Sequence, residues 1–409
     1  MMKLLLGGNP CTHWSIAQTK NRETEASGIG WELFLNYRIA RDKYQPDFFL
    51  YENNKSMSPA IREQITEELG VEPVLINSAL VSAQNRQRLY WVGRRNPDGT
   101  YSQVAVEQPV DRGILLRDIL ESGVCWKEKG YALLSTTGGT TADDMVARHQ
   151  RNGAAEPVAI KPLTEKEMDY MVRETKDGRN HFDFDYFHDA TQEKSACVTA
   201  NTHKGVPYNV LVEPVRIGTM QARLNGGGAD GAATGLYAVP VIPDGKGQFV
   251  IKAAGGKEIP VYEVRGGRIT IKGKTYPIKL ADGFYIIRKL TVTECKRLQT
   301  VPDAYVFPVS GTQAYKMLGN GWTVDVIAHI MSHFDGLTTE PLEVLSMYDG
   351  MSCGHIALDK LGAQVTAYYA TEIDKYAIQT TQANYPETVQ LGDAFQVRDE
   401  NWRIPNETI

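Results

Sequence analysis

What this chain of 409 residues lacks already limits the class of protein that it can be. No apolar run approaches the roughly 20 residues of a membrane-spanning helix, and Gly-Gly-Asn-Pro cuts off the short apolar stretch at the start. The five cysteines form no Cys-x-x-Cys pair, and no cysteine pair accompanies His329 and His333. We therefore expect a cytoplasmic protein with reduced thiols, no secretion signal, no membrane partner and no metal site.

Positive charge is not in excess either, because the formal net charge is −5. The charge is unevenly placed, however. Residues 241–290 hold ten Lys and Arg against four Asp and Glu, whereas residues 341–409 hold four against ten. The first region suits contact with a polyanion and the second does not, although two solvated faces of opposite sign would give the same pattern.

The pattern of residues 1–121 is that of an α/β protein. Short apolar strands are expected at 4–8, 47–51, 73–77 and 88–92, and helices with apolar spacing at 30–40 and 58–69. Ser58 is placed to cap the second helix, with Pro59 at its first position. Alternating strands and helices indicate a parallel sheet with helices on its faces.

Residues 122–287 have a different character, with dense Gly and Pro and short β-branched runs. Strands are expected at 196–200, 208–212, 248–252 and 268–272, and small hairpins within 255–278. From 288 to 409 the α/β pattern resumes, with helices at 291–298 and 323–334 and strands near 342, 366–369 and 390–393. We therefore expect an irregular β-rich domain, 122–287, inserted between two parts of one α/β domain, 1–121 and 288–409.

Two chemically active residues follow expected strands. Cys11 ends the turn Gly8-Asn9-Pro10-Cys11, and Glu52 directly follows the strand expected at 47–51. Strand ends of an open α/β sheet meet at one edge, where ligands bind. There a thiolate can act as a nucleophile and a carboxyl can bind the ring nitrogen of a base. An inert buried cysteine and a solvated carboxylate would give the same local patterns.

Two arginines, Arg86 and Arg88, are spaced so that both side chains point to the same face of a strand. The strand goes on into the apolar run 89–92, so inward-facing arginines would need an anionic partner. A solvent-facing edge strand is the other interpretation of this spacing.

In this order and spacing, the three features resemble motifs of the DNA cytosine-C5 methyltransferase family. The Pro-Cys turn is similar to its motif IV, Glu52-Asn53-Asn54 to motif VI, and residues 84–88 to motif VIII. The resemblance continues through residues 288–299 (motif IX), 315–320 (motif X), 349–354 (motif I), Glu372 (motif II) and Gly392-Asp393 (motif III).

The resemblance implies a Rossmann-like domain that binds S-adenosylmethionine and releases S-adenosylhomocysteine, without a metal. The residues agree: a strand, a Gly-rich turn and a helix at 342–354 form an adenosyl-binding crevice, with an acidic residue near the next strand end. The turn is neither a dinucleotide nor a Walker fingerprint, so a cofactor without a pyrophosphate is expected. The expected cofactor residues are Leu33, Asn320, Tyr348, Asp349, Gly350, Ser352, Gly354, Glu372, Ile373, Asp393 and Ala394.

The motif order differs from that of the family, which runs I, II, III, IV, VI, VIII, recognition domain, IX, X. Here motifs I to III come last, so the resemblance implies a circular permutation. We expect residues 1–6 to lie near the segment after Phe395. We also expect residues 4–6 to form a central strand beside the strand of residues 390–391.

By resemblance, a cytosine is flipped out of double-stranded DNA. Cys11 then attacks its C6, Glu52 holds N3, and Arg86 and Arg88 orient the ring oxygen and the Glu52 carboxylate. Residues 15–30 would form a mobile loop over the base, although an ordinary surface loop would look the same. Residues 122–287 would contact DNA, and a monomer in a bacterial or phage-infected cell is expected.

Two other functions stay open: an RNA cytosine-C5 methyltransferase on the same scaffold, and a non-catalytic DNA-binding relative. One departure from the family also stands out. Motif X usually continues Gly-Asn-Ser, but here the residues are Gly319-Asn320-Gly321-Trp322. The added indole would alter the cofactor pocket, and acceptance of a modified donor is one hypothesis.

Overall fold

The computed structural model describes residues 1–10, 13–15, 22–148, 151–158, 242–243, 249–252 and 258–405. The chain divides into two compact units. The first comprises Met1–Ile119, Lys129–Gly139 and Val292–Ile409, and the second comprises Leu120–Glu128 and Thr140–Thr291. Cys11 and the expected strands 196–200 and 208–212 lie outside the described residues. No helix in the described ranges is long and apolar enough to cross a membrane.

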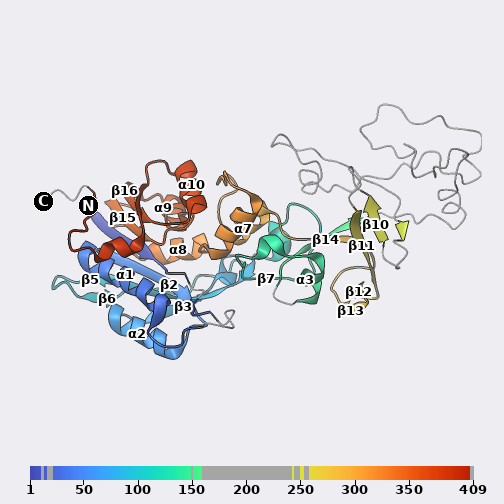
Figure 1. Ribbon diagram of the computed structural model, residues 1–409, viewed down its shortest axis with the longest axis horizontal. Coiled ribbons are helices and arrows are strands. Elements are labelled where there is room, and N and C mark those ends of the chain that lie inside the picture. Colours follow the sequence, from blue (N-terminus) through green and yellow to red (C-terminus); the bar gives the residue numbers. More distant parts are fainter. Residues whose placement is uncertain are drawn as a thin grey trace, which may run out of the picture. The chain divides into compact units, whose positions relative to one another are not determined.

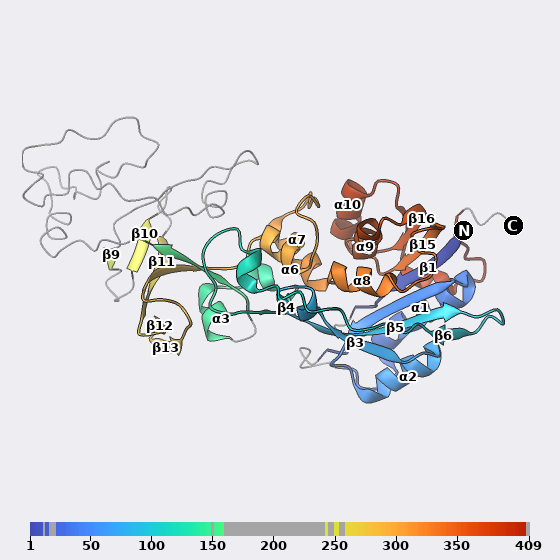
Figure 2. The same cartoon turned by 180° about the vertical axis from the view of Figure 1, so that it is seen from behind.

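One mixed sheet forms the centre of the first unit (Figures 1 and 2). Among the described residues it has eight strands, in the order β17-β16-β15-β1-β2-β5-β3, with β6 paired to β5. The bounds are β1 Met2–Gly7, β2 Phe48–Asn54, β3 Pro73–Asn77, β5 Gln87–Arg95, β6 Tyr101–Gln103, β15 Pro341–Met347, β16 Gln364–Thr371 and β17 Val389–Gly392. A short pair, β4 (Gln84–Asn85) with β7 (Gly130–Tyr131), lies apart from it.

The first strand is the central one. β1 pairs in parallel with β15 on one side, where Leu5 faces Leu345, and with β2 on the other, where Leu5 faces Phe49. All three side chains are fully buried. An unbroken apolar run such as Leu4-Leu5-Leu6 is what a parallel strand covered on both faces requires.

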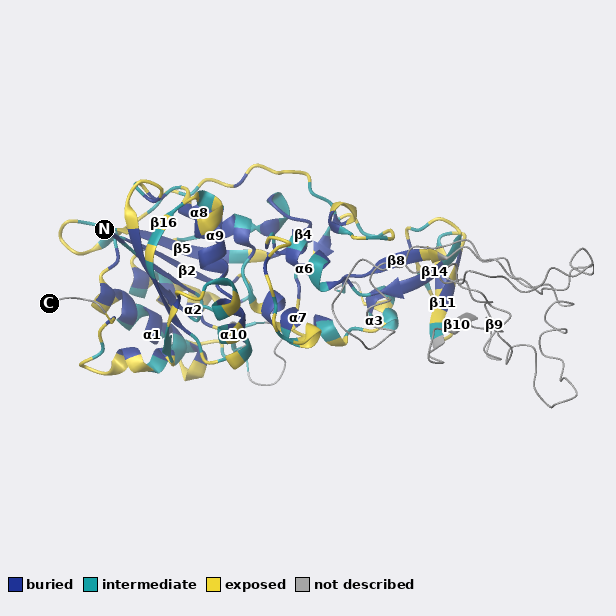
Figure 3. Ribbon diagram, turned by 90° about the horizontal axis from the view of Figure 1, so that it is seen from above, coloured by how far each residue is buried: buried dark blue, intermediate teal, exposed yellow. Residues whose placement is uncertain are grey.

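Helices cover both faces of this sheet, as the alternation predicted. On one face, α1 and α2 pack over Leu5, Phe49 and Trp91. On the other, α9 lies so close that a Cβ at Gly354 would be 2.6 Å from the Leu6 side chain. Figure 3 shows the buried strands between more exposed helices. The helix bounds are α1 Gly28–Tyr44, α2 Pro59–Leu69, α6 Val292–Leu298, α7 Gly311–Asn320, α8 Val324–Met331, α9 Cys353–Leu361 and α10 Lys375–Asn384.

The predicted start of helix α2 is confirmed, whereas the predicted direction of one strand is not. Helix α2 begins at Pro59, and the Ser58 hydroxyl accepts the Ile61 N–H, as predicted. The prediction of an entirely parallel sheet was wrong, because β5 runs antiparallel to both β2 and β3. Only residues 78–86 connect β3 to β5, which is too short for the crossover of a dozen or more residues that parallel neighbours need.

The predicted neighbourhood of the two chain ends is confirmed in part. Met1 and Pro405, which lie at or near the two ends of the described chain, both bond to β16: the Thr366 hydroxyl donates to the Met1 sulfur, and the Tyr369 hydroxyl donates to the Pro405 carbonyl at 2.9 Å. The prediction that residues 4–6 lie beside residues 390–391 was wrong. β15 and β16 lie between β1 and β17, so a connection from β17 to β1 would cross over both strands.

The second unit is β-rich in its described part, with antiparallel strands in the order β13-β12-β11-β10-β9 and with β14 between β11 and β8. The expected hairpins are confirmed. Gly266-Gly267 joins β11 to β12, and Lys272-Gly273 joins β12 to β13, with positive φ at all four residues. Two such residues make the turn whose twist matches paired strands. The bounds are α3 Ala142–Ala147, β8 Ala154–Val158, β9 Ile242–Pro243, β10 Phe249–Lys252, β11 Glu258–Arg265, β12 Arg268–Ile271, β13 Lys274–Pro277 and β14 Gly283–Arg288.

A buried ion pair joins the two strands β8 and β14 of this unit. The Arg288 guanidinium donates to the Glu156 carboxylate at 2.6 Å, and both side chains are under a tenth exposed. Arg288 also donates to the Ser122 carbonyl, so its charge and its hydrogen-bonding groups are satisfied together.

We predict that Arg288→Met destabilises the second unit by about 3–5 kcal/mol, because Glu156 is left buried without its cation. Urea unfolding followed by fluorescence measures the change. Arg268→Met, at an exposed position of β12, is the matched control and should change stability by less than about 0.5 kcal/mol. Equal effects of the two substitutions would contradict this account of the ion pair.

Candidate active site at the carboxyl edge of the sheet

One row of registered residues crosses five adjacent parallel strands of the first unit. It runs through Tyr51 of β2, Gly7 of β1, Met347 of β15, Thr371 of β16 and Gly392 of β17. Parallel strands lie about 4.8 Å apart, so the row is about 19 Å long. Each expected site segment begins one residue after it, at Glu52, Gly8, Tyr348, Glu372 and Asp393 respectively.

The turn after β1 is held by polar side chains from β2. The Asn9 side chain is buried, accepts from the Tyr51 hydroxyl and from the Asn53 amide at 3.1 Å, and donates to the Gly30 carbonyl at 3.2 Å. Burial raises the pKa of Tyr51, which keeps this hydroxyl a neutral donor. The turn that precedes Cys11 is therefore fixed by two neighbouring elements, β2 and α1, although Cys11 itself is outside the described residues.

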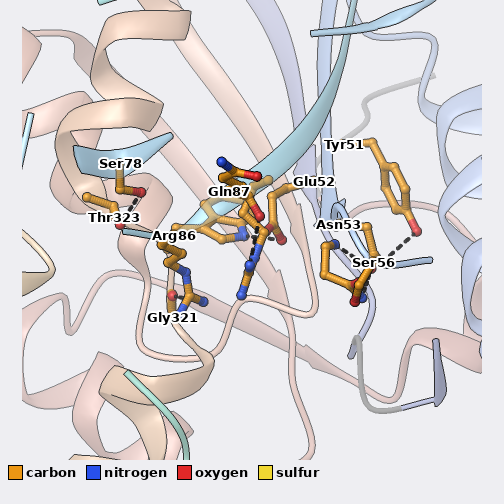
Figure 4. Close-up of polar contacts among 12 residues, drawn as sticks. Tyr51, Glu52, Asn53, Ser56, Ser78, Arg86, Gln87, Gly321 and Thr323 are labelled. Atoms are coloured by element: carbon orange, nitrogen blue, oxygen red, sulfur yellow. Dashed lines mark hydrogen bonds and ion pairs between the residues drawn. The ribbon is translucent and has the colours of Figure 1, made fainter. Parts of the chain in front are cut away.

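Glu52 lies beside this turn, 8 % exposed. Its two carboxylate oxygens have different partners: Arg88 pairs with one at 2.9 Å, and the Trp322 indole N–H donates to the other at 3.1 Å. A side chain at Gly8 would meet the Glu52 carbonyl at 2.7 Å, so the Cys11 turn and Glu52 approach each other closely. One side of the carboxyl is thus held by a cation and the other by a neutral donor (Figure 4).

Arg86 has other partners than Arg88; the two were expected to orient the ring oxygen of the base and the Glu52 carboxylate. Its buried guanidinium donates to the main-chain carbonyls of Leu133, Gly319 and Gly321, at 3.3, 3.2 and 2.9 Å. The last two carbonyls belong to the end of α7 and the residue that caps it (Figure 4). Arg86 therefore fixes the backbone immediately before Trp322.

A buried polar network fixes the backbone immediately after Trp322. The Thr323 hydroxyl donates to Gln299 at 2.9 Å and accepts from the Ser78 hydroxyl at 2.9 Å. Gln84 donates to the same Gln299 oxygen at 2.7 Å, and Gln299 donates to the Leu318 carbonyl at 2.6 Å. These residues join the motif IX, X and VIII segments into one rigid support.

The Gly-rich turn after β15 has a strained backbone. Tyr348, Gly350 and Ser352 all have positive φ, which non-glycine residues rarely adopt. Glu372 holds the turn from the next strand end, since one of its oxygens accepts the Gly350 N–H at 2.8 Å. Its other oxygen accepts the N–H groups of Ile373 and Asp374. A ligand bound to this carboxylate would therefore be held against the turn itself.

Asp349 is the titratable group in this turn. Burial raises the pKa of its carboxyl to about 6, although hydroxyl groups of Ser352, Ser346 and Tyr368 donate to it and lower the value. The Glu372 charge nearby acts in the same direction as burial. Asp349 therefore organises the turn through Ser352 and Tyr368.

The remaining expected cofactor residues line the same edge. Ile373 is 74 % exposed, which is unusual for a large apolar side chain, and Asp393 is exposed while its carboxylate caps the turn Ala394–Arg398. Ala394 is buried. Two further residues come from helices: the Leu33 carbonyl accepts from the Tyr348 hydroxyl at 2.7 Å, and Asn320 is exposed at the end of α7.

Several residues of this site were not predicted as such. Trp322 was noted as a departure from the family pattern, but nothing in the sequence indicates its bond to Glu52, which is 270 positions away. Gln84 and Gln299 stand inside recognised motifs, yet their mutual contact depends on the fold. For Asn9 and Asn53 the sequence does give a local signal, because each amide lies in a segment that directly follows an expected strand.

The family described as C-5 cytosine-specific DNA methylase matches residues 1–335 of this chain. The chain belongs to this family. The matched residues contain the Cys11, Glu52 and Arg88 segments and end before the Gly-rich turn that follows β15. The match therefore covers β1, β2, β3, β5 and β6 of the sheet and ends before β15, β16 and β17.

Relatives in this family are distant in sequence. The Type II methyltransferase M.HpaII of Haemophilus parainfluenzae is 24 % identical over 336 residues, 79 % of this chain and 69 % of that protein. The orphan methyltransferase M.SPRI of Bacillus phage SPR is 24 % identical over 382 residues, 80 % of this chain and 81 % of that protein. A solved methyltransferase of Entamoeba histolytica, EhMeth, is 14 % identical, covers 81 % of this chain and 76 % of that chain, and has a TM-score of 0.34.

Two carboxyls at this edge should respond to pH in opposite directions. The pKa of Asp349 is raised, so its stabilising protonated form is lost as pH rises from about 4 to about 6. The pKa of Asp374 is lowered, because bonds from Lys316 and from the Tyr376 N–H outweigh the opposing effect of burial. Its stabilising ionised form is lost as pH falls below the ordinary range.

We therefore predict that wild-type protein loses stability relative to Asp349→Asn as pH rises from about 4 to about 6.5, and loses stability relative to Asp374→Asn as pH falls below about 4. Urea unfolding midpoints of the three proteins from about pH 2.5 to about pH 6.5 measure both differences. If the two differences changed with pH in the same direction, the assigned environments would be contradicted.

Proposed function

We propose that this protein is a DNA cytosine-5-methyltransferase in which Cys11 and Glu52 act on the base and the segments after β15, β16 and β17 bind S-adenosylmethionine. The observation that carries the proposal is the registered row from Tyr51 to Gly392. It aligns a base-binding half and an adenosyl-binding half on one sheet edge, as an open α/β site requires. Family membership supports the same conclusion independently.

In the proposed reaction the Cys11 thiolate adds to C6 of cytosine, forming the carbon–sulfur bond and shifting electrons toward C5. Glu52 binds N3 and the exocyclic amine, and Arg88 holds the carboxylate while it does so. S-adenosylmethionine supplies the methyl group to C5. The C5 proton is then removed and the carbon–sulfur bond breaks, which returns Cys11 and leaves 5-methylcytosine.

The residues at the cofactor half fit this donor. Nothing lies within 4 Å of the position that a Cβ at Gly350 would occupy, so a ligand can approach this backbone. Glu372 is placed for ribose hydroxyls, exposed Ile373 offers an apolar face, and Asp393 can accept from an amine. The carboxylates of this half suit a sulfonium cation better than a phosphate.

A cytosine inside a duplex is out of reach of an edge site, so the proposal includes flipping of the target base. The basic stretch 241–290 of the second unit would contact phosphates, which position a protein on DNA without specifying sequence. Residues 122–287 are therefore proposed as the target-recognition domain of a monomeric enzyme.

The proposal also includes the circular permutation. The Gly-rich turn after β15 and the two strands that follow come last in sequence, yet β15 pairs directly with the first strand β1. The family match ends at residue 335, before this segment begins. Met1 and Pro405 both bond to β16, so joining the two ends requires no rearrangement of the sheet.

The nucleophile is tested by substitution. Cys11→Ser should lower methyl transfer to duplex DNA by at least about a thousandfold, because a hydroxyl is a far weaker nucleophile than a thiolate. A radiolabel assay with DNA and tRNA in parallel measures it. Cys125→Ser, in the second unit, is the matched control and should keep wild-type activity. Unchanged activity in Cys11→Ser, or methylation of tRNA alone, would reject the proposal.

The permutation is tested by moving the cut. A rearranged chain that begins at Thr339, in the exposed segment before β15, with residues 409 and 1 joined by a short Gly-Ser linker, should keep activity within about tenfold. A control cut after Gly350, inside the turn that Glu372 holds, should abolish it. Loss of folding in the first rearrangement would contradict the proposed arrangement.

A further inference from the structure

The indole of Trp322 is the one neutral donor among the described partners of the Glu52 carboxyl group. Arg88 and Trp322 take one carboxylate oxygen each, at 2.9 and 3.1 Å. Two bonds from different elements, β5 and the segment after α7, fix the plane of the carboxyl as well as its position. A carboxyl held by Arg88 alone would be free to turn about that bond.

The backbone around Trp322 is held unusually firmly for a residue outside regular structure. Before it, the Gly321 carbonyl accepts from Arg86 at 2.9 Å and from Gln299 at 3.2 Å. After it, Thr323 is buried within the hydrogen bonds to Ser78 and Gln299 (Figure 4). The buried polar groups on both sides therefore fix the position of the indole. Its bond to Glu52 is made from a segment whose backbone is held on both sides.

The ring itself spans the two halves of the site. Its N–H faces Glu52, while its far edge lies 3.7 Å from the position of a Cβ at Gly354, in the helix that follows the Gly-rich turn. Phenylalanine would fill most of this space but could not donate to Glu52.

We infer that Trp322 is a positioning residue for methyl transfer, whose indole N–H orients the Glu52 carboxyl group toward the target cytosine. The inference rests on the proposed function, because it assigns Glu52 to the base. It gives a role to the indole of the motif X segment, which directly follows Gly321, the position at which the related pattern has a serine. Trp322 acts through Glu52. Loss of its indole N–H should therefore slow methyl transfer without weakening the binding of DNA or S-adenosylmethionine.

The kinetic test uses Trp322→Phe in the full-length protein. We expect kcat for DNA methylation to fall about tenfold to a hundredfold, the effect of losing one hydrogen bond to a charged group. The KM values for DNA and S-adenosylmethionine should change less than about threefold, because neither ligand loses a contact. Trp402→Phe is the matched control, because Trp402 lines the same pocket as Tyr44, whose hydroxyl donates to the Glu343 carbonyl near the opposite end of β15.

A second experiment does not depend on catalytic activity. In protein labelled with ¹⁵N at tryptophan, the indole N–H resonance of Trp322 should move in Glu52→Gln, and that of Trp402 should not. Unmoved Trp322 would overturn the inference while leaving the proposed function intact. A moved resonance with unchanged kcat in Trp322→Phe would also overturn it, and a wild-type protein that methylates no DNA would overturn the proposed function together with it.

Discussion

The parallel pairing of β1 with β15 is the contact on which the rest of the structure depends. It joins strands from opposite ends of the sequence, in a register from Met2–Leu342 to Gly7–Met347, at the buried centre of the sheet. Because the register places Gly7 beside Met347, the turn before Cys11 and the Gly-rich turn open side by side. A slip of one residue would turn one strand over relative to the other and would move the two turns out of alignment.

Polar side chains then determine what this edge can do. Asn9, Asn53 and Tyr51 hold the turn before the proposed nucleophile, whereas Glu372 holds the turn proposed to bind the adenosyl group. Between them stands Glu52, buried but compensated by Arg88 and Trp322. Burial of a carboxyl is costly unless it is paired and hydrogen-bonded, so Arg88 and Trp322 together offset the cost of burying Glu52. The two arginines of one motif have separate tasks, with Arg88 at the carboxyl and Arg86 at the backbone before Trp322.

Much of this could be predicted from residues whose signals are local. Pro59 and Ser58 begin a helix, and apolar runs such as Leu4-Leu5-Leu6 form buried strands, because propensity and capping act over a few residues. The position of β17 could not be predicted, because a crossover can pass over intervening strands and sequence order does not fix strand order. The antiparallel direction of β5 follows from the short connection of residues 78–86, which the alternation of strands and helices alone does not reveal. The bond from Trp322 to Glu52 depends on two remote elements meeting, which no local pattern encodes.

The central claim is that segments from both ends of the chain form one cytosine-methylation site, with Cys11 as its nucleophile. A duplex that contains 5-fluorocytosine at the target position tests it directly, since C5 then has no proton to lose and the carbon–sulfur bond persists after methyl transfer. The account predicts a covalent protein–DNA adduct that forms only with S-adenosylmethionine and that peptide mass spectrometry assigns to Cys11. No adduct, or an adduct at any other cysteine, would contradict it.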